Sequence, residues 1–313
     1  MKFNINNYKR YIAVLWLITA ITASGQQDPV YTQYNFNTQT INPAYAGTWE
    51  RMGFLFLGRH QWIGMEGAPQ TYTFSFQTNT SNDKVGLGLN LISDQIGREN
   101  RLSLFGDYSY GLRVGEESML RFGLKAGVTN YKNNLLEYIQ YPGEPDPAVL
   151  GDTDMRYLPN FGVGTFLNSS GYYIGFSIPK MIENDFDHNY NNYSTQVEVR
   201  HFYLMGGYVL PLSENLQFKP TFLALATTGA PLEFDFSANF LLGEKVWLGA
   251  MYRTGESFGF IAQWIFENNL RIGYAVDFTT SELQTFNNGA HEVMVSYEIA
   301  LEKKKKWSSP RMF

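Results

Sequence analysis

The sequence is 313 residues long, with 24 basic and 29 acidic residues and no cysteine. The acidic balance argues against a nucleic-acid-binding protein, which usually presents a basic surface, and the lack of cysteine excludes disulfides and thiolate chemistry. Aromatic residues make up 16 % of the sequence and its mean hydropathy is −0.25, a composition that suits an outer-membrane β-barrel and a secreted β-sandwich equally well.

Residues 1–25 are predicted to be a secretion signal peptide. The apolar run in this stretch is too short for a membrane-spanning helix, which needs roughly 20 residues. No acidic residue occurs before Asp28, so cleavage would make the mature protein more acidic. The parts of the signal are a basic n-region, an apolar run and small residues at the cleavage positions: Lys2, Lys9 and Arg10; residues 11–21; and Ala23, Ser24 and Gly25.

The segment 26–52 precedes the first predicted strand and has no long alternating run. It is rich in Asn, Gln, Thr and Tyr, and it contains two prolines. A disordered lead-in is one interpretation. Because aromatic residues are unusual in disordered tails, we predict instead a folded, plug-like element that enters a barrel lumen from the periplasmic side. The candidate plug residues are Tyr31, Tyr34, Phe36, Asn42, Pro43 and Tyr45.

From residue 53 onward, apolar and polar residues alternate with period 2. Between Leu232 and Leu242, for example, one face carries Leu, Phe and Ala and the other carries Glu, Asp, Ser and Asn, which a helical period does not fit. Most predicted strands are about ten residues long, which suits a tilted strand that crosses a bilayer. Fourteen strands are predicted, starting near Gly53, Gln70, Lys84, Asn100, Met119, Tyr157, Gly171, Gln196, Asn215, Leu232, Lys245, Ser257, Asn269 and Ala290.

The connections between these strands alternate in length. Tight polar turns follow the even-numbered strands. Longer connections follow several odd-numbered strands, at Ile63–Pro69, Asn133–Arg156, Lys180–Thr195 and Thr280–Gly289, although the turns near Thr228–Pro231 and Thr254–Glu256 are short. Short periplasmic turns and long outer loops are the rule for outer-membrane barrels. Both termini would then lie in the periplasm.

The charged residues of the strands fall on the face opposite the large apolar residues. A Lys or Arg that faces lipid at mid-membrane costs roughly 2–4 kcal/mol, so this face should line the lumen. We therefore predict an all-β fold, a 14-stranded antiparallel transmembrane outer-membrane β-barrel over 53–300, rather than a soluble sandwich. The predicted inward charges are Arg101, Arg121, Lys125, Arg200, Lys219, Arg253, Arg271, Asp107, Glu198, Glu233, Asp235, Asp277, Glu292 and Glu298.

No group of residues suggests catalysis, a metal or a cofactor. The four histidines, His60, His188, His201 and His291, lack metal-ligand spacing. The Gly-x-Gly pairs at 86/88 and 162/164 open no helix, so they are interpreted as strand glycines that relieve crowding. Asp94 and Glu99 lie in the stretch DQIGRE, which we interpret as a turn between strands. A non-enzymatic protein is expected.

The segment 301–313 is predicted to be a periplasmic tail beyond the last strand. Four consecutive lysines, Lys303–Lys306, suit a solvated charge run near lipid head groups. The alternative is a docking peptide for a partner protein, because the tail also contains anchor residues of the kinds found at interfaces. These are Trp307, Pro310, Arg311 and Phe313.

Four stretches carry a resemblance to a known family. They are QDPVYTQYNFNTQTINPAYAG at 27–47, RHQWIGMEGAPQTYTFSFQ at 59–77, GLGLNLISDQIG at 86–97 and AHEVMVSYEI at 290–299. Together they resemble the PorP/SprF family over essentially the whole mature protein. The ending SPRMF is similar to the SPRYF-like end of the gliding-associated branch, with Met312 in place of the usual Tyr.

The resemblance implies an outer-membrane component of the type IX secretion system, needed for export or surface anchoring of large adhesins used in gliding motility. It implies three kinds of partner: the C-terminal domain of a secreted adhesin, the periplasmic ring lipoproteins and a peptidoglycan-binding protein. Outer-membrane lipid would surround the barrel. We place the outer contact in the long connections, at Pro142, Pro145 and Pro147 and in Lys180–Thr195. The alternative function is a transporter of hydrophobic small molecules, similar to fatty-acid channels.

Overall fold

A computed structural model describes residues 29–49, 52–80, 84–134, 153–184 and 198–299. The predicted signal peptide and the predicted tail lie outside the described residues, and so does most of the long connection 134–152. Within the described ranges no helix has the length and apolar character needed to cross a membrane.

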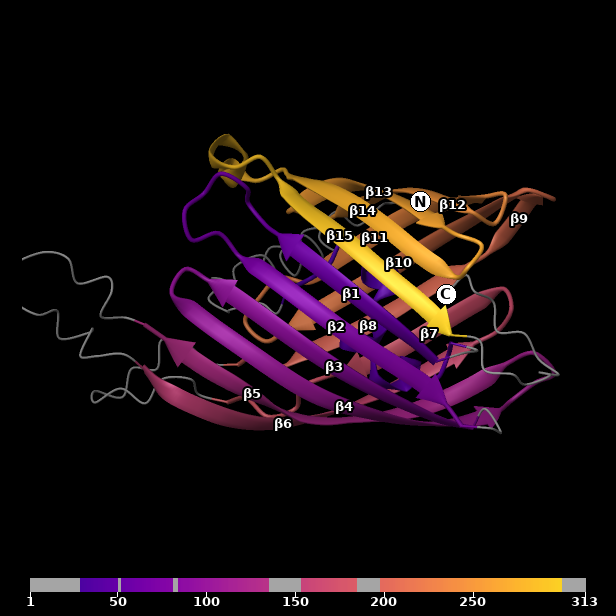
Figure 1. Ribbon diagram of the computed structural model, residues 1–313, viewed down its shortest axis with the longest axis horizontal. Coiled ribbons are helices and arrows are strands. Elements are labelled where there is room, and N and C mark those ends of the chain that lie inside the picture. The colour runs from indigo at the N-terminus through magenta and orange to yellow at the C-terminus, as the bar shows by residue number, and fades with distance from the viewer. Residues whose placement is uncertain (1–28, 50–51, 81–83, 135–152, 185–197, 300–313) are drawn as a thin grey trace, which may run out of the picture.

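The described strands form one antiparallel sheet in which neighbours in sequence are neighbours in space (Figure 1). Their bounds are β1 (Met52–His60), β2 (Gln70–Asn79), β3 (Val85–Ile96), β4 (Glu99–Arg113), β5 (Met119–Asn133), β6 (Thr153–Asn168), β7 (Tyr172–Ile178), β8 (His201–Tyr208), β9 (Leu210–Ser213), β10 (Leu216–Thr227), β11 (Glu233–Leu242), β12 (Val246–Arg253), β13 (Ser257–Ile265), β14 (Leu270–Thr279) and β15 (Ala290–Ile299).

The sheet closes into a barrel because β1 pairs with β15 and β10 pairs with β11. β8 and β9 are one wall strand, since both pair with β10 in the same register, Gly207 opposite Thr221 and Leu210 opposite Phe218. The strand is interrupted beside Pro220, which has no N–H to donate to the ladder. The wall is therefore a closed, 14-stranded antiparallel barrel, as the sequence predicts, and the sixth strand begins earlier than expected, at Thr153.

The outside of the wall is apolar and the inside is polar. On β11, Phe236 is 51 % exposed whereas the adjacent Asp235 is 1 % exposed. The same alternation recurs around the barrel, and it is the reverse of the pattern in a soluble protein, so the outer face suits lipid. All the charged residues predicted to face inward are buried or half-buried. The prediction of a charged, mixed-sign interior is thus confirmed.

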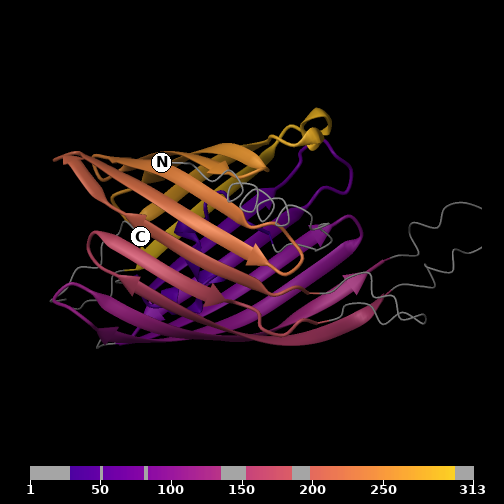
Figure 2. The ribbon, with the colours of Figure 1, turned by 180° about the vertical axis from the view of Figure 1, so that it is seen from behind.

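The two ends of the barrel differ in the length of their connections (Figures 1 and 2). We call one end the short-turn rim, where β2, β4, β6, β9, β11 and β13 lead by short turns into the next strand. We call the other the long-loop rim, which carries residues 61–69, 134–152, 179–200 and 280–289, the last including the 3-10 helix η5 (Glu282–Phe286). β1 begins and β15 ends at the short-turn rim.

The lipid-facing assignment predicts the effect of a single charge. Phe236→Arg should lower the free energy of unfolding by about 2–4 kcal/mol relative to Phe236→Leu, because the guanidinium would have to enter lipid. Urea titration of the barrel folded into vesicles measures this difference. Equal stability of the two variants would show that Phe236 does not face the bilayer.

Candidate functional site in the barrel lumen

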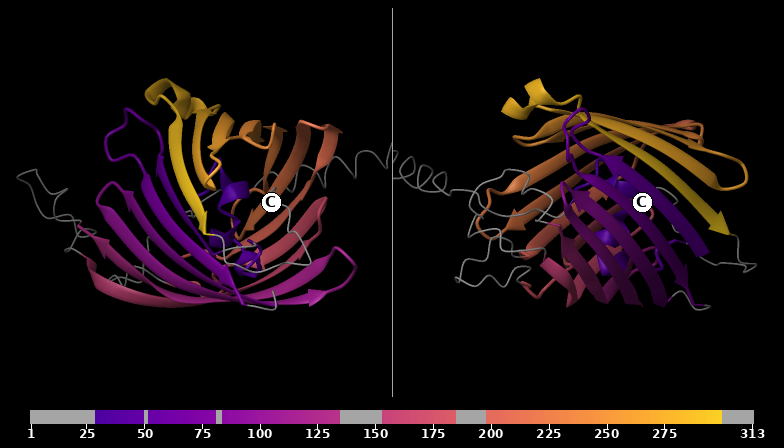
Figure 3. Two further views of the ribbon diagram at one scale, coloured as in Figure 1. Left: turned by 45° about the vertical axis from the view of Figure 1, so that its right-hand side comes forward. Right: turned by 60° about the vertical axis from the view of Figure 1, so that its left-hand side comes forward.

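The segment 29–49 lies inside the barrel (Figure 3). It forms three single-turn 3-10 helices, η1 (Tyr34–Phe36), η2 (Thr38–Thr40) and η3 (Pro43–Tyr45). Asn42 caps η3, because its side-chain oxygen accepts a 2.9 Å hydrogen bond from the backbone N–H of Ala44, and Pro43 suits the first turn because it needs no donor there. Every residue from 31 to 48 except Thr40 is buried.

The segment runs the full length of the lumen. Near its start, the Thr32 N–H donates to Glu292, which lies at the long-loop end of β15. Midway, the Asn35 side chain donates to Ser237 of β11. Near its end, the Asn79 side chain donates to the carbonyl of Trp49 at the short-turn end of β2. The segment therefore passes from the long-loop rim to the short-turn rim.

The wall accommodates the segment at glycines. A Cβ on Gly123 of β5 would lie 2.1 Å from the backbone nitrogen of Ala44, and one on Gly86 of β3 would lie 2.1 Å from the carbonyl oxygen of Ala46. Both distances are far below van der Waals contact. The Gly-x-Gly at 86/88, interpreted from sequence as relief of crowding within a strand, thus provides room for the segment.

All six predicted plug residues are buried against the wall. The Tyr31 hydroxyl lies 2.6 Å from the Thr73 hydroxyl, and the Tyr34 hydroxyl lies 3.2 Å from that of Thr221. The Asn42 amide donates to the Thr165 carbonyl across 3.0 Å. The rings of Phe36 and Tyr45 pack edge-on against those of Trp247 and Phe166, at centroid distances of 5.9 and 5.4 Å, and Pro43 lies against Gly123 and Gly164.

A buried charge cluster ties the start of the segment to the wall. We define the Arg59 cluster as Thr32, Arg59, Asp277 and Glu292. One guanidinium nitrogen of Arg59 lies 2.8 Å from an Asp277 oxygen and 2.7 Å from a Glu292 oxygen. The same two carboxylates accept from the segment: Glu292 from the N–H groups of Thr32 and Gln33, at 2.7 and 3.0 Å, and Asp277 from the Thr32 hydroxyl, at 2.6 Å.

The sequence placed Asp277 and Glu292 in the lumen but did not identify Arg59 as their partner. The cause lies in β1, where Leu55 and Leu57 face inward and Phe54 and Phe56 face outward. Both faces are apolar, so alternation does not show the phase of this strand. The period-2 spacing of side chains could have placed Arg59 in the lumen, since Arg59 is two residues beyond Leu57 and lies on the same face of the strand.

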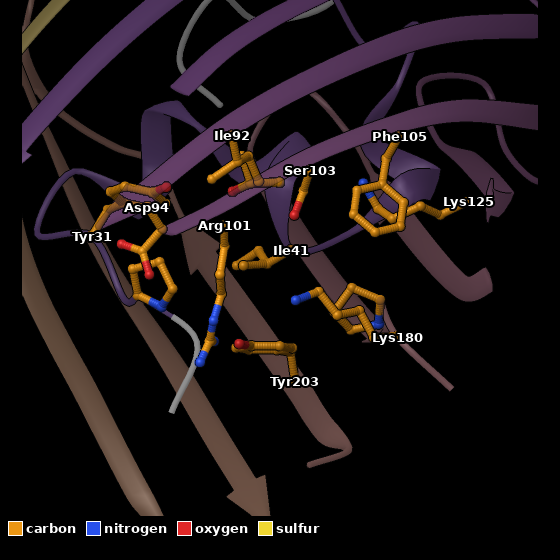
Figure 4. A pocket seen from close by; sticks show the side chains of 13 residues that line it. Tyr31, Ile41, Ile92, Asp94, Arg101, Ser103, Phe105, Lys125, Lys180 and Tyr203 are labelled. Carbon is orange, nitrogen blue, oxygen red and sulfur yellow. The ribbon is translucent and has the colours of Figure 1, made fainter. Parts of the chain in front are cut away.

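A pocket of about 60 Å³ lies between the segment and the wall, in the half of the lumen nearer the long-loop rim (Figure 4). Residues of β3, β4, β5 and β8, the stretch after β7 and the segment itself line it. Its apolar surface comes from Pro29, Tyr31, Ile41, Ile92, Phe105, Pro179 and Tyr203, and its charged groups are Asp94, Arg101, Lys125 and Lys180.

Each cation of the pocket has a carboxylate partner. Arg101 Nε donates to Glu99 across 2.7 Å, Lys125 lies 2.8 Å from Asp107, and Lys180 lies 2.9 Å from Glu198. Asp94 accepts a 2.6 Å hydrogen bond from the Thr71 hydroxyl. The interpretation of DQIGRE as a turn is therefore wrong for its acidic residues, because only Gly97 and Arg98 connect the strands and both carboxylates lie on the wall.

The predicted outer contact Lys180–Thr195 is described as far as Asn184. This stretch fills a step in the wall, since β6 pairs with β7 only from Val163 to Asn168. The Asn160 side chain of β6 accepts from the backbone of Met181 and Ile182 and donates to Glu198, so a polar network holds the stretch in place. Pro142, Pro145 and Pro147 lie outside the described residues, as do Trp307, Pro310, Arg311 and Phe313.

The described histidines belong to the wall. The His60 ring lies 2.8 Å from the Tyr72 hydroxyl, and His291 contacts Tyr274. His201 stacks on Tyr203, with ring centroids 6.1 Å apart. Within the ranges that the structure describes, no three acidic or histidine side chains are grouped so that they could hold a metal ion.

Solved barrels resemble this structure at low sequence identity. A Pseudomonas aeruginosa FadL homologue is 13 % identical, the match covering 88 % of this protein and 96 % of the homologue, with a TM-score of 0.45. The KdgM porin is 9 % identical, with coverages of 79 % and 99 % and a TM-score of 0.38. Salmonella typhi OmpF in complex with daunomycin is 9 % identical, with coverages of 79 % and 97 % and a TM-score of 0.35.

No curated protein matches the sequence at a significant level. A family model does match, and it is described as the type IX secretion system membrane protein PorP/SprF. The match spans residues 23–297, which includes the lumen segment and nearly all of the wall. The chain therefore belongs to the PorP/SprF family of type IX secretion system membrane proteins.

Proposed function

We propose that the protein is a non-enzymatic outer-membrane component of the type IX secretion system that supports export or surface anchoring of large adhesins used in gliding motility. The observation that carries this proposal is a closed barrel whose lumen is occupied from rim to rim by residues 29–49. A barrel filled in this way suits a role in holding partners at its two rims better than a role as an open conduit.

In this proposal the long-loop rim faces the cell surface and holds the C-terminal domain of the adhesin. The short-turn rim faces the periplasm, where the tail after β15 contacts the secretion apparatus, including ring lipoproteins and a peptidoglycan-binding protein. The long connections at one rim and the short turns at the other support this orientation. The proposed contacts are Pro142, Pro145 and Pro147 outside, and Trp307, Pro310, Arg311 and Phe313 inside.

The segment 29–49 is proposed to act as a plug that seals the lumen. Its buried aromatic side chains pack against the wall, and the Arg59 cluster fixes its start. The alternative, a transporter of hydrophobic small molecules, needs a cavity for its substrate. The pocket of about 60 Å³ is too small for a fatty acid, because roughly 10–15 Å³ of such volume is needed for a single water.

Partner capture tests the proposed secretion role. Tagged protein purified from detergent-solubilised outer membranes should co-purify with secretion components and with an adhesin. Deletion of residues 303–313 should remove the periplasmic partners and leave the adhesin bound, because the two contacts lie at opposite rims. Recovery of the barrel without any secretion component would contradict the proposal.

The path of the segment predicts on which side of the membrane its start is accessible. The protein has no cysteine, so single-cysteine variants report one position each. Val30→Cys should react with a membrane-impermeant maleimide in intact cells, as should Ser281→Cys at the long-loop rim. Glu267→Cys at the short-turn rim should react only after the outer membrane is permeabilised. Protection of position 30 in intact cells, with reaction after the outer membrane is permeabilised, would instead place the start of the segment on the periplasmic side.

The Arg59 cluster predicts a specific leak. Arg59→Met leaves Asp277 and Glu292 without their buried counter-charge, a loss of about 3–5 kcal/mol, and part of it falls on the contacts that hold Thr32. We expect raised ion conductance in planar bilayers. Arg253→Met is the matched control, because Arg253 pairs with Asp235 and Glu233 of the wall. Equal conductance of the two variants would argue against sealing by the segment.

A further inference from the structure

The pocket in the long-loop half of the lumen has a polarised lining. Arg101, Lys125 and Lys180 all line it, whereas Asp94 is the acidic residue among the described lining residues. The carboxylates that pair with the three cations, Glu99, Asp107 and Glu198, are not part of the lining. The lining of the pocket therefore carries three cationic side chains and one carboxylate.

Two of these cations keep some contact with the exterior. The Arg101 and Lys180 side chains are 11 % and 18 % exposed, compared with 3 % for Lys125. Figure 4 shows them projecting from different parts of the wall, Arg101 from β4 and Lys180 from the stretch after β7. Arg101 and Lys180 are therefore the more accessible of the three cations.

The size of the pocket limits what it can hold. Because each water-sized atom needs roughly 10–15 Å³ of such volume, a cavity of about 60 Å³ holds about four to six heavy atoms. A carboxylate on one methylene has four heavy atoms, and propionate has five. The polar end of such a group would meet Arg101 and Lys180, and its carbon would lie against Ile41 and Tyr203, which are apolar parts of the same lining.

We propose that this pocket binds a carboxylate on a short apolar stem, with Arg101 and Lys180 as the binding residues. The source we favour is a protein segment at the long-loop rim, presenting either an acidic side chain or its own C-terminal carboxylate. That source rests on the proposed secretion function, whereas the carboxylate chemistry does not. Charge-assisted hydrogen bonds from a guanidinium and an ammonium provide the recognition.

Neighbouring residues affect the affinity of the site and connect it to the lumen segment. Asp94 lies in the same lining and repels an incoming carboxylate, so it weakens binding and requires close pairing with the cations. Pro29, Tyr31 and Ile41 of the segment also line the pocket. A bound carboxylate therefore contacts the same segment that continues to the short-turn rim.

The first experiment uses the full-length protein purified in detergent and ligand-observed NMR with propionate as the probe. Propionamide, which has the same shape without the charge, is the comparison compound. A ligand of five heavy atoms binds no more tightly than about a few micromolar, and about millimolar affinity is expected. Arg101→Gln and Lys180→Gln should each weaken propionate binding about tenfold.

Two further variants separate binding from folding. Lys245→Gln removes an exposed ion pair at the short-turn rim and should leave propionate affinity unchanged. Asp94→Asn can still accept from Thr71 and removes the repelling charge, so it should strengthen propionate binding several-fold, a gain that misfolding cannot produce. Equal binding of propionate and propionamide, or unchanged affinity in both glutamine variants, would overturn the proposal.

Short peptides distinguish the two sources. Ac-Gly-Gly-Val with a free C-terminus tests a terminal carboxylate, its amide is the blank, and Ac-Gly-Glu-Gly-amide tests an acidic side chain. Binding of either free carboxylate supports the proposal and names the source, whereas binding of neither, with propionate bound, would overturn the protein-segment source. Since the purified barrel is used alone, failure here leaves the partner-capture result of the secretion role intact, and the converse also holds.

Discussion

A charge enclosed in a barrel lumen is stable only when another group satisfies it, and this constraint governs the interior of the protein. Lipid outside forces the polar face of every strand inward, and the segment 29–49 then displaces water from that face. The charged side chains form ion pairs across strands: Arg59 with Asp277 and Glu292, Lys125 with Asp107, and Arg253 with Asp235. Backbone N–H groups of the segment complete the first of these sets, so wall and segment depend on each other.

The fold was predictable because lipid imposes a simple pattern. Where one face of a strand meets lipid and the other meets the lumen, as at Phe236 and Asp235, alternation shows both the strand and its phase. The prediction weakened where the lumen itself is apolar. Leu55 and Leu57 pack against the segment, so β1 is apolar on both faces. The sequence therefore did not show that Arg59 faces the lumen.

The sequence pointed to the aromatic and amide residues of the lumen segment, but it did not show the course that the segment takes through the barrel. Aromatic and amide side chains indicated that 26–52 is folded, yet short 3-10 turns have no periodicity from which a direction could be derived. Long-range partners fix that direction, such as Thr32 with Glu292, 260 residues apart. The pocket was missed for a related reason, since DQIGRE has turn composition while its acidic ends belong to β3 and β4.

The position of the segment in the sequence has a consequence for the order of assembly. The segment immediately precedes β1, and the barrel closes where β1 meets β15, the pair most distant in sequence. Contacts between distant residues form late, because long loops must be closed first. Once that seam has formed, a segment fixed at β1 and extending to the opposite rim could enter the lumen only by threading. Folding of the wall around the segment avoids that threading, and residues 29–49 would then be a template for barrel closure as well as its contents.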